Sequence, residues 1–464
     1  MNKTPRNASR ARVWRVFCTN RTVSRTCWTP SAVLRRIEEG RDVADSVSAP
    51  ETNDKESFEM SMSTGDKLAL LGGLPVRDPQ CAWPSWPVFD DAERKAVNDV
   101  LESGKWWFGD RVKQFEKDYA AFQDAAHCVT CSSGTAAAEI CLQAMGIGPG
   151  DEVIVPPYTF VATASSVLRV GATPIFADVD ESWCLSPESV EAAITPRTKA
   201  IVPVHFAGRI ADMDRLNALA ARHGLMVMED ACHSWGSKWK GKGTGALGHA
   251  GVFSFQNSKN ITAAEGGAIL TDNEDLAERC RAITNCGRLK GSQWYAHSLL
   301  GTNARITEFA AAILSAQLTR LEAQTILREK NAAILDEGLR EMEGITVQPG
   351  DPRITRRGYH LYCVRINPDA FGCTREQFTA AAEAEGLPIG AGYGMPLYKQ
   401  PVMAHYAHRH DYSRDFCPMT EDLCSRSGMW FVHQLLLGAE NDMQDIIAIF
   451  KKIKAHAGDL KGGG

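Results

Sequence analysis

The chain has 464 residues, of which 44% are hydrophobic and 23% are charged, so it is long enough for one large two-domain protein or for two to three ordinary domains. A formal net charge of -5 and an isoelectric point near 6.2 give no general attraction to nucleic acid or to anionic membranes. No apolar run approaches the roughly 18 residues of a membrane-spanning helix, and 14 cysteines without a repeated spacing suit reduced thiols, so we expect a cytoplasmic protein.

The first 64 residues differ in composition from the rest. Nine Lys and Arg residues precede the first acid, and an acidic polar stretch then runs to Ser63. An Arg-rich transit segment and a basic nucleic-acid tail are two interpretations. We favour a disordered extension, or sequence upstream of a true start at Met60 or Met62, because neither half shows sustained apolar periodicity.

From Leu68 onward the spacing of apolar residues is regular. It predicts helices over 90–103, 111–122, 136–145, 161–169, 187–193 and 213–223, and strands over 127–130, 152–155, 173–177, 200–204 and 225–229. Alternating short strands and helices indicate a mostly parallel sheet that helices cover on both faces. Such α/β sheets bind ligands at the carboxyl ends of their strands.

A lysine-bearing loop between two apolar runs is the most distinctive stretch of the chain. The run over 251–255 ends at a polar turn with Lys259, and Gly266 and Gly267 lead into a second run over 268–270. A lysine in a packed turn loses ammonium solvation, which lowers its pKa and makes it a usable nucleophile. Because a loop lysine is usually a solvated charge, the neighbouring loops decide between the two interpretations.

Two further loops at predicted strand ends carry polar side chains. Ser133, Gly134 and Thr135 open a helix, where hydroxyls, N–H groups and the helix dipole could cradle a phosphate. The alternative for this turn is a plain helix N-cap. Glu229 and Asp230 end an apolar strand, and the alternative for them is a capping carboxylate that faces solvent.

Together the three loops meet the requirements of pyridoxal 5′-phosphate (PLP). Its aldehyde requires a lysine amine, its phosphate a cradle of N–H and hydroxyl groups, and its pyridine nitrogen a carboxylate that keeps it protonated. Lys259, residues 133–135 with Ser254, and Asp230 supply these groups. The combination predicts a PLP enzyme far more specifically than any one loop does.

The sequence resembles the DegT/StrS sugar aminotransferases, a family of fold-type I PLP enzymes, from about Leu71 to His456. The resemblance rests on stretches in family order, among them CSSGTAAAEICLQA, VMEDACHSWGS, GVFSFQNSKNITAAEGGAILTD and GTNARITEFAAAILSAQL. It implies an α/β fold, with a large PLP-binding domain over 65–330 and a smaller C-terminal α+β domain over 331–464.

The resemblance also implies catalytic roles. Lys259 corresponds to the Schiff-base lysine that shuttles the proton, and Asp230 to the partner of the pyridine nitrogen. His233 lies where members have Gln or His near the ring oxygen. The loop begins with Ala264 where the family has the first glycine of GEGG, so a methyl group could alter the turn. The presence of Lys259 argues against the relatives that carry His there and dehydrate sugars.

The remaining cofactor contacts follow in the same way. Phe160 matches the aromatic residue that stacks on the cofactor ring, and Ser133, Gly134, Thr135 and Ser254 resemble the phosphate cup. Asn303, in GTNAR, matches an asparagine that reaches the phosphate from the neighbouring subunit. The resemblance therefore implies a homodimer with shared active sites.

The C-terminal part and one aromatic group carry weaker signals. Spacing predicts one or two long helices over 307–337, further helices over 374–385 and 441–456, and a strand over 359–364. Tyr393, Pro396 and Tyr398 resemble a family loop near the sugar. The aromatic residues 106–108 (WWF) are expected in core or dimer packing, because no basic groove surrounds them as a base-stacking platform would require.

Two constellations suggest metal sites, and we predict none. Cys128 and Cys131 form a C-x-x-C pattern, but no second pair follows at zinc spacing, and strand periodicity places the two thiols on opposite faces. A His-rich loop carries His405, His408 and His410, and such loops are usually solvated.

The predicted function is a PLP-dependent aminotransferase that moves an amino group from L-glutamate or L-glutamine to a ketone. The acceptor is a keto-sugar, nucleotide-linked in the broader prediction, or a cyclitol. The segment MWFVHQLLLG and the chain's end resemble members that use glutamine and inosose-type ketones. A PLP-dependent dehydratase or lyase and a PLP-binding regulator without turnover stay open, although the sequence shows no DNA-binding helix-turn-helix or dense basic patch.

Overall fold

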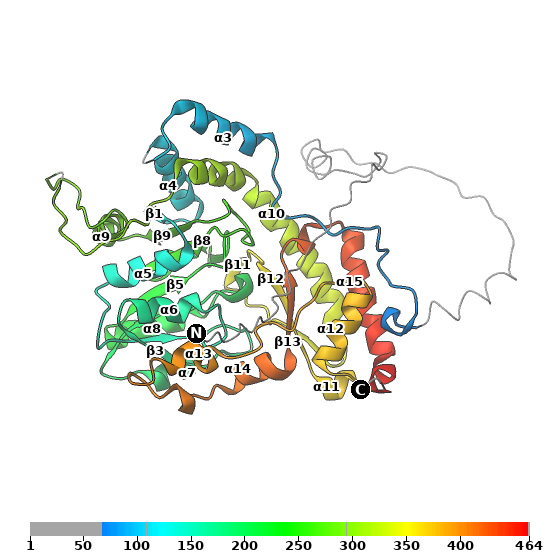
Figure 1. Cartoon of the computed structure of the whole chain (residues 1–464). Helices are drawn as coiled ribbons and strands as arrows, with labels where there is room; N and C mark the ends of the chain where they lie inside the picture. The colour runs from blue at the N-terminus through cyan, green and yellow to red at the C-terminus, as the bar shows by residue number, and fades with distance from the viewer. Residues whose placement is uncertain (1–66, 108, 294, 463–464) are drawn as a thin grey trace, which may run out of the picture. The chain divides into compact units, whose positions relative to one another are not determined.

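The computed structural model describes residues 67–107, 109–293 and 295–462 (Figure 1). These residues all belong to one compact unit. The predicted extension over 1–64 lies outside the described residues. Within the described ranges, no helix has both the length and the apolar composition that a membrane span needs.

A seven-stranded sheet positions the candidate site. Its strands in spatial order are β1 (His127–Cys131), β9 (Gly267–Thr271), β8 (Ala250–Ser254), β5 (Met226–Asp230), β4 (Thr198–Ile201), β2 (Glu152–Val155) and β3 (Thr173–Phe176). Every neighbouring pair from β8 to β3 is parallel, and β9 is antiparallel to both β1 and β8. The predicted mostly parallel α/β sheet is confirmed.

Successive side chains along each strand point alternately into two apolar cores, one on each face of the sheet. In β2, Val153 and Val155 join one core and Ile154 joins the other. Helices α5 (Gly134–Ala144), α6 (Ala162–Arg169) and α9 (Glu274–Thr284) bury apolar residues in the first core, and α7 (Pro187–Ala193) and α8 (Met213–His223) in the second. Burial of both faces explains why the parallel strands read as nearly continuous apolar runs.

Helix ends follow the capping signals in the sequence. Helix α3 (Asp91–Ser103) begins with a capping box between Asp90 and Glu93 and ends at Gly104, whose φ of 64° is left-handed. Helix α4 (Asp110–Phe122) follows it and packs against α10 (Glu308–Arg340) and β1. These elements place the aromatic segment before α4 beside the start of α10.

Helix α10 leads from the large sheet to a three-stranded antiparallel sheet. That sheet has the order β10 (Ile345–Val347), β12 (Leu361–Ile366) and β13 (Gly428–Val432). Helices α12 (Arg375–Ala384) and α15 (Glu440–Ala455) pack on it and share one apolar core with the end of α10 (Figure 1). Because α10 continues through the predicted boundary at 330, the division into domains over 65–330 and 331–464 stays a prediction.

The remaining strands and α-helices of the described chain are short. They are β6 (Lys238–Trp239), β7 (Lys242–Gly243), β11 (Ile354–Arg356), α11 (Pro368–Phe371), α13 (Pro401–Ala404) and α14 (Pro418–Asp422). Strands β11, β6 and β7 form a second three-stranded sheet.

Candidate active site

Lys259 lies in the loop that follows the carboxyl end of β8. Its side chain is partly buried, and its Nζ is 5.7 Å from the centre of the Trp235 ring. Burial lowers the pKa of Lys259, and the electrostatic influence of the neighbouring Cys232 and Asp230 opposes this shift. The structure thus gives this lysine the weakly solvated environment that its sequence context predicted.

Asp230 is the last residue of β5, and its charge favours the ammonium form of Lys259. Its Oδ2 accepts a hydrogen bond from the Thr163 hydroxyl at 2.7 Å, and its Oδ1 accepts one from the backbone N–H of Cys232 at 3.2 Å. Thr163 belongs to α6, and nothing in the sequence alone distinguished it from other threonines in apolar helices. These two donors orient the carboxylate at the sheet edge where Lys259 lies.

The start of α5 packs tightly against the end of β8. A Cβ atom at Gly134 would lie 2.7 Å from the Cβ of Ser254 and 3.2 Å from the sulfur of Cys232, and one at Gly267 would overlap the carbonyl oxygen of Ser133. The Ser133 hydroxyl caps the helix by accepting from the N–H of Ala136 at 3.1 Å. The N-cap interpretation is therefore confirmed for this hydroxyl, while the first N–H groups of the helix keep no intrahelical acceptor and suit an anion.

His233 belongs to a group of three buried histidines. We call His233, His360 and His433 the histidine cluster. Ring centres are 4.4 Å apart for the first two and 5.5 Å apart for the last two. Burial holds the pKa of each well below its usual value, with Lys259 as a further cause in all three, so the rings are neutral. His233 was predicted from the sequence, and the other two were not.

Phe160 and Asn303 lie at the surface. The side chain of Phe160 is 58% exposed, and its carbonyl oxygen accepts from the N–H of Thr163 at the start of α6. Asn303 is exposed, and its backbone forms an isolated bridge with Asn285. In the described ranges, no hydrogen bond joins the Asn303 side chain to Lys259 or its neighbours, so both roles stay predictions.

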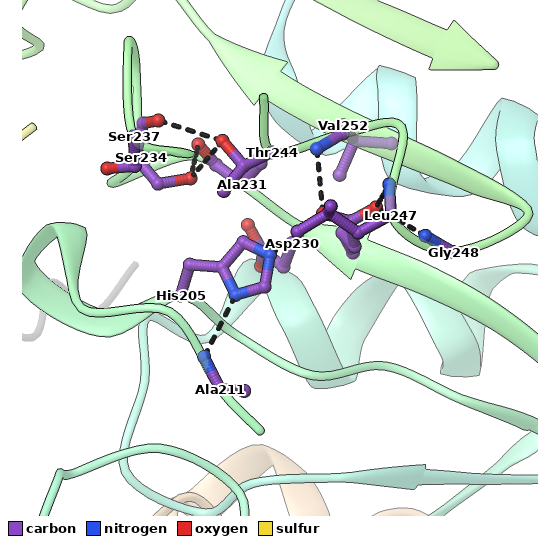
Figure 2. A network of polar contacts seen from close by, with 12 residues as sticks. His205, Ala211, Asp230, Ala231, Ser234, Ser237, Thr244, Leu247, Gly248 and Val252 are labelled. Atoms are coloured by element: carbon purple, nitrogen blue, oxygen red, sulfur yellow. Dashed lines mark hydrogen bonds and ion pairs between the residues drawn. The ribbon is translucent and has the colours of Figure 1, made fainter. Parts of the chain in front are cut away.

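Glu229, the neighbour of Asp230, faces the opposite side of β5 and is fully buried. Its carboxylate accepts from the backbone N–H groups of Gly245, Leu247 and Gly248 at 2.7 to 2.8 Å and lies 2.9 Å from Nε2 of His205. Figure 2 shows part of this network, with His205 Nδ1 accepting from Ala211 at 3.3 Å. The solvent-facing alternative for Glu229 is wrong, and its role is to hold the 245–248 turn.

The two candidate metal groups differ in their environment. Cys128 and Cys131 are buried in different apolar cores on opposite faces of β1, as predicted. His410 pairs with Asp415 at 2.7 Å. Across the described chain, no group of three or more potential ligands is arranged to hold a metal.

The aromatic segment before α4 is not core. Trp106 is 52% exposed and Trp107 is 59% exposed, so the core interpretation is wrong for both, while Phe108 lies outside the described residues. The two tryptophans line a hollow of about 490 Å³. Packing in a dimer remains the prediction for this surface.

Comparisons with known proteins place the chain among aminotransferases. A model of the DegT/DnrJ/EryC1/StrS aminotransferase family matches residues 87–451. The 3-amino-5-hydroxybenzoate synthase of Amycolatopsis mediterranei is 38% identical over 387 residues, which cover 81% of this chain and 98% of the relative. The L-glutamine:2-deoxy-scyllo-inosose aminotransferase of Streptoalloteichus tenebrarius is 38% identical over 424 residues, which cover 85% and 99%. The crystal structure of DesI in the presence of its TDP-sugar product aligns with a TM-score of 0.73 at 28% identity, covering 86% and 99%.

Proposed function

The chain belongs to the DegT/DnrJ/EryC1/StrS aminotransferase family, and we propose that it transfers the amino group of L-glutamine to the ketone of a cyclitol. The enzyme is a PLP-dependent aminotransferase. The donor and the acceptor are supported by the similarity to the L-glutamine:2-deoxy-scyllo-inosose aminotransferase. L-Glutamate as donor and a nucleotide-linked keto-sugar as acceptor are the second candidate, which the similarity to the enzyme solved with a TDP-sugar supports.

The observation that carries the proposal is the arrangement of three groups at one sheet edge. Lys259 has its pKa lowered by burial, Asp230 acts on it electrostatically, and Gly134 meets Ser254 at the start of α5. When bound, PLP supplies an aldehyde that joins reversibly to an amine and a ring that accepts electrons from the donor's α-carbon. The residues present fit this cofactor, because amine, carboxylate and helix N-terminus match its aldehyde, ring nitrogen and phosphate.

Each of these residues has a task that its environment supports. Asp230, oriented by Thr163 and the N–H of Cys232, holds a proton on the ring nitrogen. Lys259, with its lowered pKa, is more often neutral near pH 7 than an exposed lysine, so its amine can take the proton from the donor's α-carbon and return it. Gly134 leaves space that any side chain would fill.

We further propose a cytoplasmic homodimer in which Asn303 reaches the neighbouring subunit's phosphate site. The exposure of Asn303 and of Trp106 and Trp107 supports a role outside their own subunit. Buried free thiols such as Cys128 and Cys131 suit a reducing compartment.

Isotope transfer tests the donor and the acceptor together. The purified enzyme with PLP is incubated with L-glutamine or L-glutamate, each labelled with ¹⁵N at the α-amino group. Each donor is combined with a cyclitol ketone and, in a separate reaction, with a nucleotide-linked keto-sugar. The proposal predicts ¹⁵N in an aminocyclitol. Labelled amino-sugar would favour the second candidate, and a deoxygenated keto product without ¹⁵N would indicate elimination instead. Absence of turnover with both donors and both acceptors would contradict the proposal.

A further inference from the structure

Two buried histidines contact the residues on either side of Lys259. His360 directly precedes β12, His433 directly follows β13, and the N–H of His433 donates to the carbonyl oxygen of His360 at 3.1 Å. Nε2 of His433 lies 3.1 Å from the carbonyl oxygen of Ser258, and Nδ1 of His360 lies 2.9 Å from Oδ1 of Asn260. A pair of histidines from the C-terminal sheet thus holds both neighbours of the lysine.

Arg328 determines which ring nitrogen of His433 carries hydrogen. Nη2 of Arg328 lies 3.1 Å from Nδ1 of His433, and a guanidinium can only donate, so Nδ1 accepts. Nε2 therefore carries the hydrogen and donates it to Ser258. Arg328 is fully buried, and its Nε and Nη1 have no hydrogen-bond partner in the described part of the chain. Burial lowers its pKa to about 9, so its place beside His433 carries a desolvation cost.

Asn260 determines the tautomer of His360 in the same way. Its Nδ2 donates to the carbonyl oxygens of Gly358 and Tyr359 at 2.7 and 3.1 Å. The other amide atom, Oδ1, is therefore the acceptor that faces His360. Nδ1 of His360 must carry the hydrogen, and each histidine of the pair has a single tautomer that donates toward the lysine loop.

We propose that His360 and His433 are positioning residues that hold the lysine loop so that the Lys259 amine stays in its weakly solvated place. The role rests on the proposed function of Lys259. Trp86 adds a third tie, because its Nε1 donates to the carbonyl oxygen of Asn257 at 2.9 Å and its ring lies edge-on to His433 at 4.5 Å. Without these ties, water reaches the amine and restores the ordinary solvation of its ammonium form.

In the test, each histidine is replaced in turn by Gln and by Asn, whose side-chain NH₂ groups lie at different distances from the backbone. A Gln side chain places its NH₂ group near the position of a histidine Nε2, and Asn places it near Nδ1. His433→Gln and His360→Asn therefore keep the donor, and His433→Asn and His360→Gln lose it. The readout is the pH midpoint of Lys259 acetylation in the PLP-free protein, measured by peptide mass spectrometry with the exposed Lys95 as internal reference.

We expect Gln to be tolerated at position 433 and Asn at position 360, and the other two substitutions to raise the Lys259 midpoint. The midpoint for Lys259 rises by about one pH unit, a tenfold loss of neutral amine at fixed pH, in the two variants without the donor, and keeps the wild-type value in the two that retain it. The midpoint reports ionisation, so greater accessibility of a loosened loop changes the rate plateau but not this value. Equal midpoints in all four variants, or the reverse pattern, would overturn the positioning role.

Two controls separate positioning from folding. Asn331→Ala removes hydrogen bonds to the carbonyl oxygens of Leu436 and Gly438 from the same helix that carries Arg328. It should lower the melting temperature and leave the Lys259 midpoint unchanged; a shift as large as in the donor-less variants would overturn the proposal. If a histidine variant does not fold, Trp86→Phe removes one tie at the surface, and an unchanged midpoint there would count equally against it.

Failure of the underlying function is recognised separately. In the wild type, borohydride reduction after PLP addition should leave the pyridoxyl group on Lys259. If it does not, the proposed function fails whatever the variants do. If it does, and the Lys259 midpoint does not differ between the variants that keep the donor and those that lose it, the positioning role alone fails.

Discussion

The adjacent acids Glu229 and Asp230 on β5 should differ in what their charge supports. Removing the charge of Glu229 should lower stability, and removing that of Asp230 should lower activity. In Glu229→Gln, the amide oxygen can keep the N–H groups of Leu247 and Gly248. The amide NH₂ then faces two donors, the N–H of Gly245 and the Nε2–H of His205. Two charge-assisted hydrogen bonds become neutral, at about 1 kcal/mol each, and two buried N–H groups are left unpaired, at about 1–3 kcal/mol each. The free energy of unfolding should fall by about 4–8 kcal/mol.

Asp230→Asn should behave differently. The amide oxygen still accepts from Cys232, and the amide NH₂ can donate to Thr163, whose hydroxyl can turn toward Thr159 at 3.2 Å. The free energy of unfolding should change by about 1 kcal/mol or less. Loss of the carboxylate weakens protonation of the cofactor ring, so kcat/KM should fall at least roughly a hundredfold.

The assay measures urea unfolding of both variants without PLP, so that cofactor binding adds nothing to stability, and amine transfer with PLP. Equal loss of stability in the two variants, or normal amine transfer by Asp230→Asn, would refute the separate roles of Glu229 and Asp230. Comparison within one strand controls for the general sensitivity of β5.

Three further outcomes are expected. Ala264 has a φ of 69°, so Ala264→Gly should relieve left-handed strain and raise the free energy of unfolding by about 0.5–1 kcal/mol in urea, and a decrease would contradict this. In Gly134→Ala, the new methyl overlaps Ser254, and the Kd for PLP, measured by fluorescence titration, should rise at least roughly tenfold; an unchanged Kd would remove the start of α5 from the phosphate site. The histidine cluster is neutral when folded but protonates near pH 6.5 when unfolded, so its stabilisation is present above that pH and is lost as pH falls, by about 1.4 kcal/mol per pH unit for each histidine. Urea titrations at pH 7.5 and 5.5 check this slope, and equal stability would refute the buried neutral state.

Local signals in the sequence predicted the large sheet and most of its helices. The capping residues Asp90 and Thr374 and the terminating Gly104 determine helix ends within a few residues, so they were readable without tertiary information. Strand β4 was predicted over 200–204 and forms over 198–201, because an apolar run extends beyond the hydrogen-bonded ladder. Helix α9 and strand β13 were not predicted.

Contacts between distant segments were beyond the reach of sequence patterns. Lys259, Asp230 and the 133–135 turn could be combined because one cofactor requires all three kinds of group. Thr163, Arg328 and His433 matter only through the atoms they meet, and nothing in their local sequence marks those partners. Glu229 and Asp230 looked alike in sequence, and only the side of the strand each faces separates a structural role from the proposed catalytic one.

The central claim is that Lys259 is the residue that carries PLP. The most direct measurement reduces the PLP-loaded wild-type enzyme with borohydride, digests it, and locates the pyridoxyl group by peptide mass spectrometry. The account predicts one modified peptide, with the label on Lys259, and none in Lys259→Ala. A label on another lysine, or a wild-type enzyme that carries none, would contradict it.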